Sequence, residues 1–239
     1  MLPAGEEYTR VRNAECKMYN VERKVDSCYH AATFPHFSMN LLRYASLFLF
    51  CISLSACGVD TTGLSAASSR PIKGPETALV TVTEYGDFQC PACGSAYTII
   101  NQPLLAKYES KIRFEFKHFP LRTIHVNAYE AAQAAECAAD QGKFWEFVDM
   151  DYQQQKDLSS TMLRTWGAAL GLNADLFDRC IRSEIKGATI MADEAEGEKL
   201  GVSGTPAYFV NGVRVEVSSL EALVTAVDEA LAKAKSTPL

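Results

Sequence analysis

Two cysteines three positions apart form the part of this sequence best suited to chemistry. The run Cys90-Pro-Ala-Cys93 follows Gly86-Asp-Phe-Gln89, which predicts a turn, and proline is favoured in the first turn of a helix. We therefore expect both thiols at the start of a helix, where unpaired N–H groups and the helix dipole lower a thiol pKa. Such a pair can attack, leave, and cycle between a dithiol and a disulfide.

Other interpretations of the pair stay open on these residues alone. A zinc site needs two further ligands, but Cys137 and Cys180 are 43 residues apart and form no second pair. His118 and His125 lie elsewhere, each in an apolar or aromatic context that is typical of a structural histidine. A purely structural bridge is the other alternative. Three-residue spacing at a helix start favours redox activity over both.

Strand signals flank the cysteine pair. Residues 78–85 are rich in β-branched and aromatic side chains, and residues 111–119 alternate in polarity, so both predict strands. Between them, apolar residues at helical spacing predict a helix after Pro91, with a kink at Pro103. The two strands are then expected to be parallel and joined by a right-handed crossover.

The second half of the chain is mainly helical before it returns to strands. From about 125 to 200, Ala-rich and amphipathic stretches predict four or five helices. Residues 207–215 predict a β-hairpin around Asn211-Gly212, and Ser218 is a suitable cap for a last helix. This order predicts an α/β protein with a mixed sheet and helices on its faces.

Three separated motifs carry a resemblance to a known family. Glu84-Tyr-Gly-Asp-Phe-Gln-Cys-Pro-Ala-Cys93, Gly201-Val-Ser-Gly-Thr-Pro206 and Asn211-Gly212 resemble the DsbA-like branch of the thioredoxin superfamily, within residues 77–235. The resemblance implies a thioredoxin-like fold with a mixed central sheet and a helical domain inserted at about 120–200. It also implies a thiol:disulfide oxidoreductase that uses no organic cofactor and no metal.

The resemblance assigns roles to the matching positions. Cys90 is expected to be the exposed nucleophile that forms mixed disulfides, and Cys93 the buried resolving partner. Pro206 is expected to be a cis-proline facing the pair, with Thr205 beside it on the edge that pairs with a substrate strand. Without the cysteine motif, Gly204-Thr-Pro206 would predict only a turn before a strand.

One acidic residue precedes the pair within the first predicted strand. Glu84 stands where the family has an acidic residue, and a buried carboxyl near the resolving thiol can relay its proton. A strand-end glutamate that points to water is an equally good interpretation. Lys117 is a weaker expectation, as an ionic partner for this carboxyl.

Cys137 and Cys180 are the cysteines that remain in the predicted mature protein once Cys57 and the CxxC pair are accounted for. Each lies on a predicted helix. Leftover cysteines in exported proteins tend to pair, so we favour a structural disulfide that closes a loop of about 43 residues. Two packed core cysteines are the alternative. A bridge requires Cα atoms about 4.4–6.8 Å apart.

An export signal is predicted in front of this domain. Residues 45–56 form an apolar run of about twelve residues, which is shorter than the roughly 20 of a transmembrane helix and suits a signal peptide. Arg43 precedes it, and Leu54-Ser-Ala-Cys57 resembles a bacterial lipobox, in which the cysteine is acylated. A type I signal peptide or an uncleaved anchor is the alternative.

These features divide the chain into four segments. Residues 39–56 are the predicted lipoprotein signal peptide, residues 57–76 a flexible tether rich in Ser, Thr, Gly, Ala and Pro, and residues 77–239 the thioredoxin-like domain. Met39 begins a normal signal-peptide n-region, so residues 1–38 are expected to be an extension of the gene model. A genuine disordered leader is the alternative.

Composition limits the remaining classes. The 239 residues are 48% hydrophobic and 22% charged, as in globular proteins, and the net charge of -6 gives no basic footprint for nucleic acid. We predict a monomeric, lipid-anchored thiol:disulfide oxidoreductase on the periplasmic side of a bacterial membrane. Its expected partners are exported cysteine-containing proteins and a membrane or periplasmic redox partner. Oxidase activity is favoured over reductase or isomerase activity, and a non-catalytic binding lipoprotein or metal carrier is the alternative.

Overall fold

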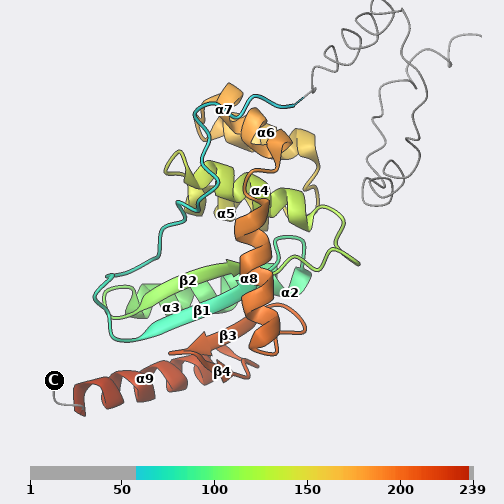
Figure 1. The fold of residues 1–239 in the computed structure, drawn as a ribbon. Helices are drawn as coiled ribbons and strands as arrows, with labels where there is room; N and C mark the ends of the chain where they lie inside the picture. Colours follow the sequence, from blue (N-terminus) through green and yellow to red (C-terminus); the bar gives the residue numbers. More distant parts are fainter. Residues whose placement is uncertain (1–57, 237–239) are drawn as a thin grey trace, which may run out of the picture. The chain divides into compact units, whose positions relative to one another are not determined.

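The computed structural model describes residues 58–236. Met39, Arg43, Cys57 and the predicted signal segment lie outside the described residues. Within the described range, the chain forms a four-stranded sheet, with a helical insert between its second and third strands (Figure 1). The α/β class and the thioredoxin-like arrangement expected from the sequence are confirmed.

The central strand of the sheet leads directly to the cysteine pair. The strands are β1 (Thr81–Gly86), β2 (Arg113–His118), β3 (Ala207–Val210) and β4 (Val213–Val215). They lie in the order β2-β1-β3-β4, with β1 parallel to β2 and antiparallel to β3, and β3 antiparallel to β4. Since β1 has a neighbour on each side, its end is held firmly at the point where the turn before Cys90 begins.

The helix after the cysteine pair contains one wider turn. It consists of α2 (Pro91–Ala96), the π-helical segment η1 (Tyr97–Asn101) and α3 (Gln102–Tyr108). The N–H of Gln102 bonds to the carbonyl of Tyr97, five residues back, rather than four as in an α-helix. Pro103 follows and has no N–H to continue the regular pattern. The π turn stands where the sequence predicts a simple kink.

Within the described part of the chain, five helices form the insert, at the top of the number expected from the sequence. They are α4 (Ala128–Ala139), α5 (Phe144–Gln153), α6 (Ser160–Ala169), α7 (Ala174–Ser183) and α8 (Gly187–Lys199). In Figure 1, α8 runs from the insert back to the sheet. A disulfide joins Cys137 of α4 to Cys180 of α7, with 5.9 Å between their Cα atoms. The bridge therefore ties the middle of the insert together, within the distance range that the sequence argument required.

Two main groups of buried side chains hold the fold. One lies inside the insert and reaches the cysteine pair through Phe88, Phe116 and Tyr152. The other lies between the sheet and the helices α3 and α9 (Leu220–Ser236), where Val82, Leu104 and Leu223 are fully buried. Cys93 belongs to the first group, so the active-site thiol is part of the contact between the thioredoxin-like core and the insert.

The segment expected to be a flexible tether lies against the domain for part of its length. The N–H of Lys73 bonds to the carbonyl of Phe114 on β2, and the indole N–H of Trp145 donates to the carbonyl of Pro71. Lys186, whose side chain is fully buried, donates to the carbonyl of Ala67 at 2.6 Å. We call residues 66–73 the strap. The composition of this stretch is typical of a linker, but its contacts make it part of the folded unit.

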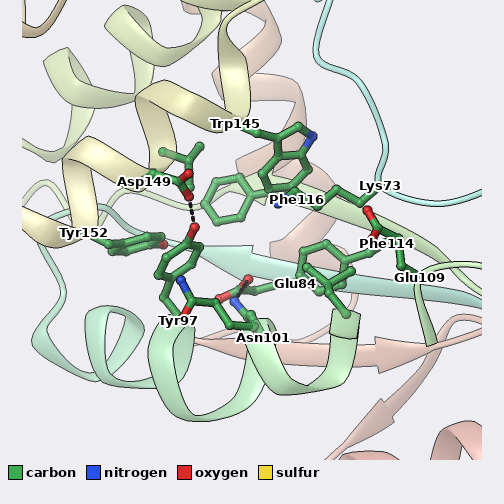
Figure 2. A pocket seen from close by; sticks show the side chains of 13 residues that line it. Lys73, Glu84, Tyr97, Asn101, Glu109, Phe114, Phe116, Trp145, Asp149 and Tyr152 are labelled. Atoms are coloured by element: carbon green, nitrogen blue, oxygen red, sulfur yellow. Dashed lines mark hydrogen bonds between the residues drawn. The ribbon is translucent and has the colours of Figure 1, made fainter. Parts of the chain in front are cut away.

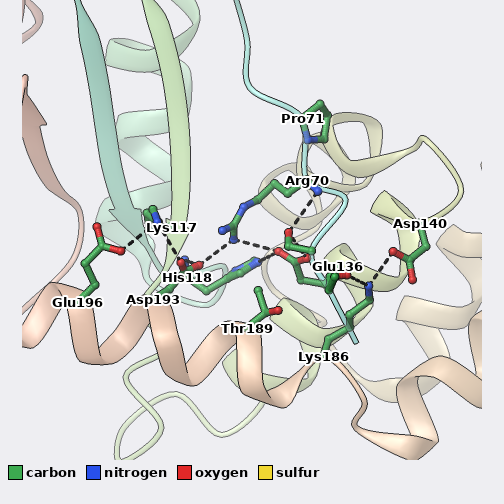
Figure 3. A network of polar contacts seen from close by, with 12 residues as sticks. Arg70, Pro71, Lys117, His118, Glu136, Asp140, Lys186, Thr189, Asp193 and Glu196 are labelled. Atoms are coloured by element: carbon green, nitrogen blue, oxygen red, sulfur yellow. Dashed lines mark hydrogen bonds and ion pairs between the residues drawn. The ribbon is translucent and has the colours of Figure 1, made fainter. Parts of the chain in front are cut away.

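A buried ionic cluster explains why the strap is held. Its Arg70 lies 2.9 Å from Glu136 of α4 and 2.8 Å from Asp193 of α8, and the His118 ring contacts Glu136 at 3.0 Å (Figure 3). The Ser68 hydroxyl, also in the strap, donates to Glu136 at 2.7 Å. Burial raises the pKa of Glu136, but the hydrogen bond from His118 and the charge of Arg70 prevail and lower it to about 2. Without the strap, this buried carboxylate would lose both Arg70 and Ser68.

Candidate active site

The cysteine pair lies at the N-terminus of α2, as the sequence predicts. Cys90 is the N-cap residue, and Pro91 occupies the first helical position. Both cysteines are free thiols; Cys90 is 7% exposed and Cys93 is completely buried. The Sγ of Cys90 lies 3.3 Å from the carbonyl oxygen of Thr205. Cys90 is therefore nearly buried beside the loop before β3, and the expectation of an exposed nucleophile is wrong.

The two thiols have opposite electrostatic environments. The hydrogen bond from the Cys93 thiol lowers the pKa of Cys90 to about 5, helped by the backbone N–H groups of Cys93 and Ala92 and opposed by burial. Burial raises the pKa of Cys93 well above its usual range, and the hydrogen bond to Cys90 raises it further. At neutral pH the reduced pair therefore carries a thiolate at Cys90 and a neutral thiol at Cys93. This difference matches the roles of nucleophile and resolving cysteine.

The loop before β3 meets the pair from the other side. Its Thr205-Pro206 peptide bond is cis. The Thr205 side chain lowers the pKa of both thiols. Its Oγ1 is buried and has no hydrogen-bond partner while Cys90 donates to the neighbouring carbonyl. A hydroxyl in this position can donate to a thiolate, which suits a site that alternates between thiol and thiolate.

Glu84 lies beneath the pair, inside the protein. Its carboxyl accepts a hydrogen bond of 2.7 Å from the Asn101 amide. The single proton of the Tyr208 hydroxyl is shared between Asn101 Oδ1, at 2.7 Å, and this carboxyl, at 3.4 Å. Burial raises the pKa of Glu84 to about 8, although both hydrogen bonds oppose the shift. Its charge also raises the pKa of Cys93. The side chain is therefore a buried acid near the resolving thiol, and not a strand-end group in water.

The expected ionic partner of Glu84 is elsewhere. Lys117 lies on β2 with its Nζ 3.1 Å from Glu196 and 3.5 Å from Asp193, both on α8. Figure 3 shows Lys117 beside Asp193, at the edge of the buried ionic cluster that holds the strap. The expectation of a Lys117–Glu84 pair is wrong, because alternation along β2 places this side chain on the α8 side. The hydrogen-bond partners of Glu84 are neutral, and they lower its pKa less than burial raises it.

A cavity reaches Glu84 from the surface. It measures about 220 Å³ and lies between α5, the η1–α3 helix and β2; Glu84 and Asn101 lie side by side among its lining residues (Figure 2). Lys73, Glu109 and Asp149 provide its charged groups, and the Tyr97 hydroxyl donates a hydrogen bond to Asp149 across it. Glu84 itself is only 1% exposed, but it lines a cavity whose volume is sufficient for water molecules.

Sequence reasoning missed two members of the site. Asn101 falls on the buried side of the π turn, and Tyr208 comes from β3, more than a hundred residues later. An asparagine among the apolar helix residues Ile100, Leu104 and Leu105 is a detectable signal, because a buried amide needs a polar partner. Nothing local marks Tyr208, since its partners lie on other elements.

The described residues contain no cluster of three or more histidine, cysteine or acidic side chains that could hold a metal ion. Among residues 58–236, no helix has the length and apolar character needed to cross a membrane.

Similarity to known proteins agrees with this geometry. A sheet of this topology, a cysteine pair at a helix start and a helical insert together define a thioredoxin-like fold with an inserted helical domain. A family model described as "Thioredoxin" matches residues 67–229. The chain therefore belongs to this thioredoxin family.

Solved structures show the same fold. BdbD from Bacillus subtilis has a TM-score of 0.63 and 19% identity over 69% of this chain and 94% of that chain. A thioredoxin-like oxidoreductase from Silicibacter pomeroyi has a TM-score of 0.62 and 26% identity over 71% and 94%. α-DsbA1 from Wolbachia pipientis has a TM-score of 0.61 and 22% identity over 69% and 92%. The DsbA-like fold expected from the motifs is confirmed.

Curated relatives include much longer proteins. "Na(+)/H(+) antiporter NhaA 1" of Salinispora arenicola is 41% identical over 169 residues, which are 70% of this chain and 26% of that protein. A protein of the same name from Mycolicibacterium vanbaalenii is 35% identical over 145 residues, 60% of this chain and 23% of that protein. The chain thus spans about a quarter of the length of these relatives.

Proposed function

We propose that this protein is an exported thiol:disulfide oxidase that introduces disulfides into cysteine-containing exported proteins. The observation that carries the proposal is the difference between the two thiols, with the pKa of Cys90 lowered to about 5 and that of Cys93 raised. A stabilised thiolate at Cys90 favours the reduced form of the pair, which makes the disulfide form a stronger oxidant. We expect a reduction potential between about -120 and -270 mV, the values of DsbA and thioredoxin.

The reaction proceeds by two exchanges. A substrate thiolate attacks Cys90 Sγ of the disulfide form; the new bond joins substrate to Cys90, and Cys93 leaves as a thiolate. A second substrate thiolate then attacks the substrate sulfur, and Cys90 leaves as a thiolate that its surroundings stabilise. The substrate loses two electrons and the Cys90–Cys93 pair gains them. A redox partner that accepts two electrons must restore the disulfide.

We propose that Glu84 donates the proton that Cys93 takes up in the first exchange. With a pKa of about 8, it is mostly protonated at neutral pH and can give a proton to the departing Cys93 thiolate, directly or through water. The cavity beside it supports exchange of that proton with solvent. Thr205, beside both sulfurs, is proposed to lie on the edge that receives the substrate backbone.

Two single substitutions test this mechanism as a matched pair. Each removes one thiol of the same motif, but only Cys93→Ala leaves the nucleophile. In an assay that follows oxidative refolding of a reduced protein, with glutathione disulfide as the oxidant, both variants lose turnover. Cys93→Ala accumulates a mixed disulfide with the substrate on a non-reducing gel, and Cys90→Ala does not. Retained turnover in Cys90→Ala would falsify the mechanism.

Export and lipid anchoring are the second part of the proposal. The lipobox-like run that ends at Cys57 supports acylation of that residue. The Cys137–Cys180 disulfide supports an oxidising compartment, because such bridges are rare in the cytosol. Labelled palmitate should appear in the protein expressed in bacteria and be absent from Cys57→Ala. Equal labelling of both proteins contradicts acylation at this position, and a start at Met39 should give the same mature product.

A further inference from the structure

One side chain of the helical insert donates hydrogen bonds to the backbone of the turn that leads to Cys90. Gln155 follows the end of α5, and its amide nitrogen lies 2.7 Å from the carbonyl oxygen of Phe88 and 2.7 Å from that of Cys90. A side-chain amide has two N–H groups, so both are used on these two carbonyls. The carbonyl of Cys90 also accepts the N–H of Gly94, which is the first bond of α2.

The sequence leaves room for this contact at one position. A Cβ atom on Gly94 would lie 2.6 Å from Gln155 Oε1, which is too close, and 3.1 Å from its Cδ, which is tight. The backbone of Gly94 is in an ordinary helical conformation, so the absence of a side chain is needed for space and not for a special φ. Glycine is less favourable than alanine within a helix. The close approach of Gln155 is a reason to retain it.

The same turn is held from its other side by the segment before α4. Asp87 accepts the N–H of Leu121 at 2.8 Å and contacts His125 Nδ1 at 2.7 Å, and it also accepts the N–H of Gln89. The side chain of Gln89 in turn accepts the N–H of Asn127 at 2.8 Å. The turn that presents Cys90 is thus fixed by both ends of the α4–α5 hairpin.

We propose that Gln155 is a positioning residue: by fixing the carbonyls of Phe88 and Cys90, it makes the Cys90–Cys93 disulfide a stronger oxidant. This inference rests on the function proposed above. Two physical effects act in the same direction. Donation by Gln155 offsets the negative end of the Cys90 carbonyl dipole close to the sulfur. It also keeps the turn in the position where the backbone N–H groups of Ala92 and Cys93 reach that sulfur. Loss of either effect destabilises the thiolate and therefore the reduced pair.

Gln155→Glu and Gln154→Glu provide the direct comparison. Both add one negative charge at neighbouring positions, but Gln154 is exposed and only Gln155 bonds to the turn. We measure the pKa of Cys90 from its thiolate absorbance, and the equilibrium of the Cys90–Cys93 pair with a glutathione buffer. Gln155→Glu should raise the Cys90 pKa by at least about one unit. It should shift the equilibrium toward the disulfide at least tenfold, which is about 30 mV for a two-electron couple. Gln154→Glu should shift it less than about twofold.

A second variant tests the same contact from the other partner, should Gln155→Glu fold poorly. Gly94→Ala places its methyl group against the end of the Gln155 side chain, which is flexible and can move away. It should shift the glutathione equilibrium in the same direction as Gln155→Ala. In the Gln155→Ala background, Gly94→Ala should have no further effect.

The outcomes separate this inference from the proposed function. If the wild-type pair exchanges with glutathione and Gln155→Glu leaves both readouts within twofold of wild type, the positioning role is wrong. The same holds if Gly94→Ala acts equally with and without Gln155. If the wild-type pair itself does not exchange, the proposed function fails, whatever the variants show.

Discussion

Replacing Glu84 by glutamine removes the buried acid while keeping its shape and its neighbours. The introduced amide can accept from the Asn101 amide through its oxygen and donate to the Tyr208 hydroxyl through its nitrogen, so both present contacts of the side chain can be kept. None of the causes of the raised Glu84 pKa is a thiol. The experiment can therefore use the disulfide form, in which Cys90 and Cys93 do not titrate.

The sign and size of the effect follow from the pKa. Below its ordinary value of 4.5 the Glu84 carboxyl is protonated in the folded and unfolded states, and its contribution to stability is fully present. As pH rises toward the folded value of about 8, the unfolded chain releases the proton and the folded protein keeps it, so that stability is lost. At 1.36 kcal/mol per pKa unit, the loss between pH 5 and pH 8 is roughly 3–4 kcal/mol.

Urea unfolding at several pH values measures this loss. The difference in unfolding free energy between Glu84→Gln and wild type should grow by about 3–4 kcal/mol from pH 5 to pH 8, in favour of the variant. Glu76→Gln, at an exposed position, removes the same charge and should show no such trend. A difference for Glu84→Gln that stays constant over this range would refute a buried, protonated carboxyl.

Three further substitutions test other parts of the structure. Thr205→Val removes the hydroxyl beside both sulfurs, so the pKa of Cys90 should rise in a thiolate absorbance titration; an unchanged midpoint contradicts that role. Arg70→Ala removes the cation that Glu136 and Asp193 share and should cost about 3–5 kcal/mol in urea unfolding, whereas a loss under about 1 kcal/mol would show that the strap is dispensable. Replacing Cys137 and Cys180 together by serine should cost about 3–4 kcal/mol, and free, alkylatable thiols at both positions of the wild type would contradict the bridge.

Local sequence signals were sufficient for the parts of the site that lie close together along the chain. Cys90, Pro91 and Cys93 are placed at a helix start by the turn before them and by the position that proline favours. The element order followed from periodicity, because strands and amphipathic helices differ in repeat. The distant Thr205-Pro206 pair needed the family resemblance, since a turn before a strand has no unique local pattern.

Contacts between distant elements decided what the sequence left open. Side chains along β1 point alternately to the two faces of the sheet. This alternation alone does not tell whether the face that carries Glu84 is covered by a helix or open to water. Its burial depends on Asn101 and Tyr208, which are 17 and 124 residues away. Likewise, the composition of the strap is that of a linker, and contacts with distant elements hold it in place, among them those of Arg70 with α4 and α8.

The central claim is that Cys90 is a thiolate at neutral pH and Cys93 a shielded thiol. The most direct measurement is limited alkylation of the reduced protein over a range of pH, with the modified cysteine identified by mass spectrometry. We expect modification of Cys90 alone. Its rate should rise through a midpoint near pH 5, because the hydrogen bond from Cys93 lowers the pKa of Cys90 to about 5. A midpoint between about 8 and 9, as for an ordinary thiol, or modification of Cys93 before Cys90, would contradict it.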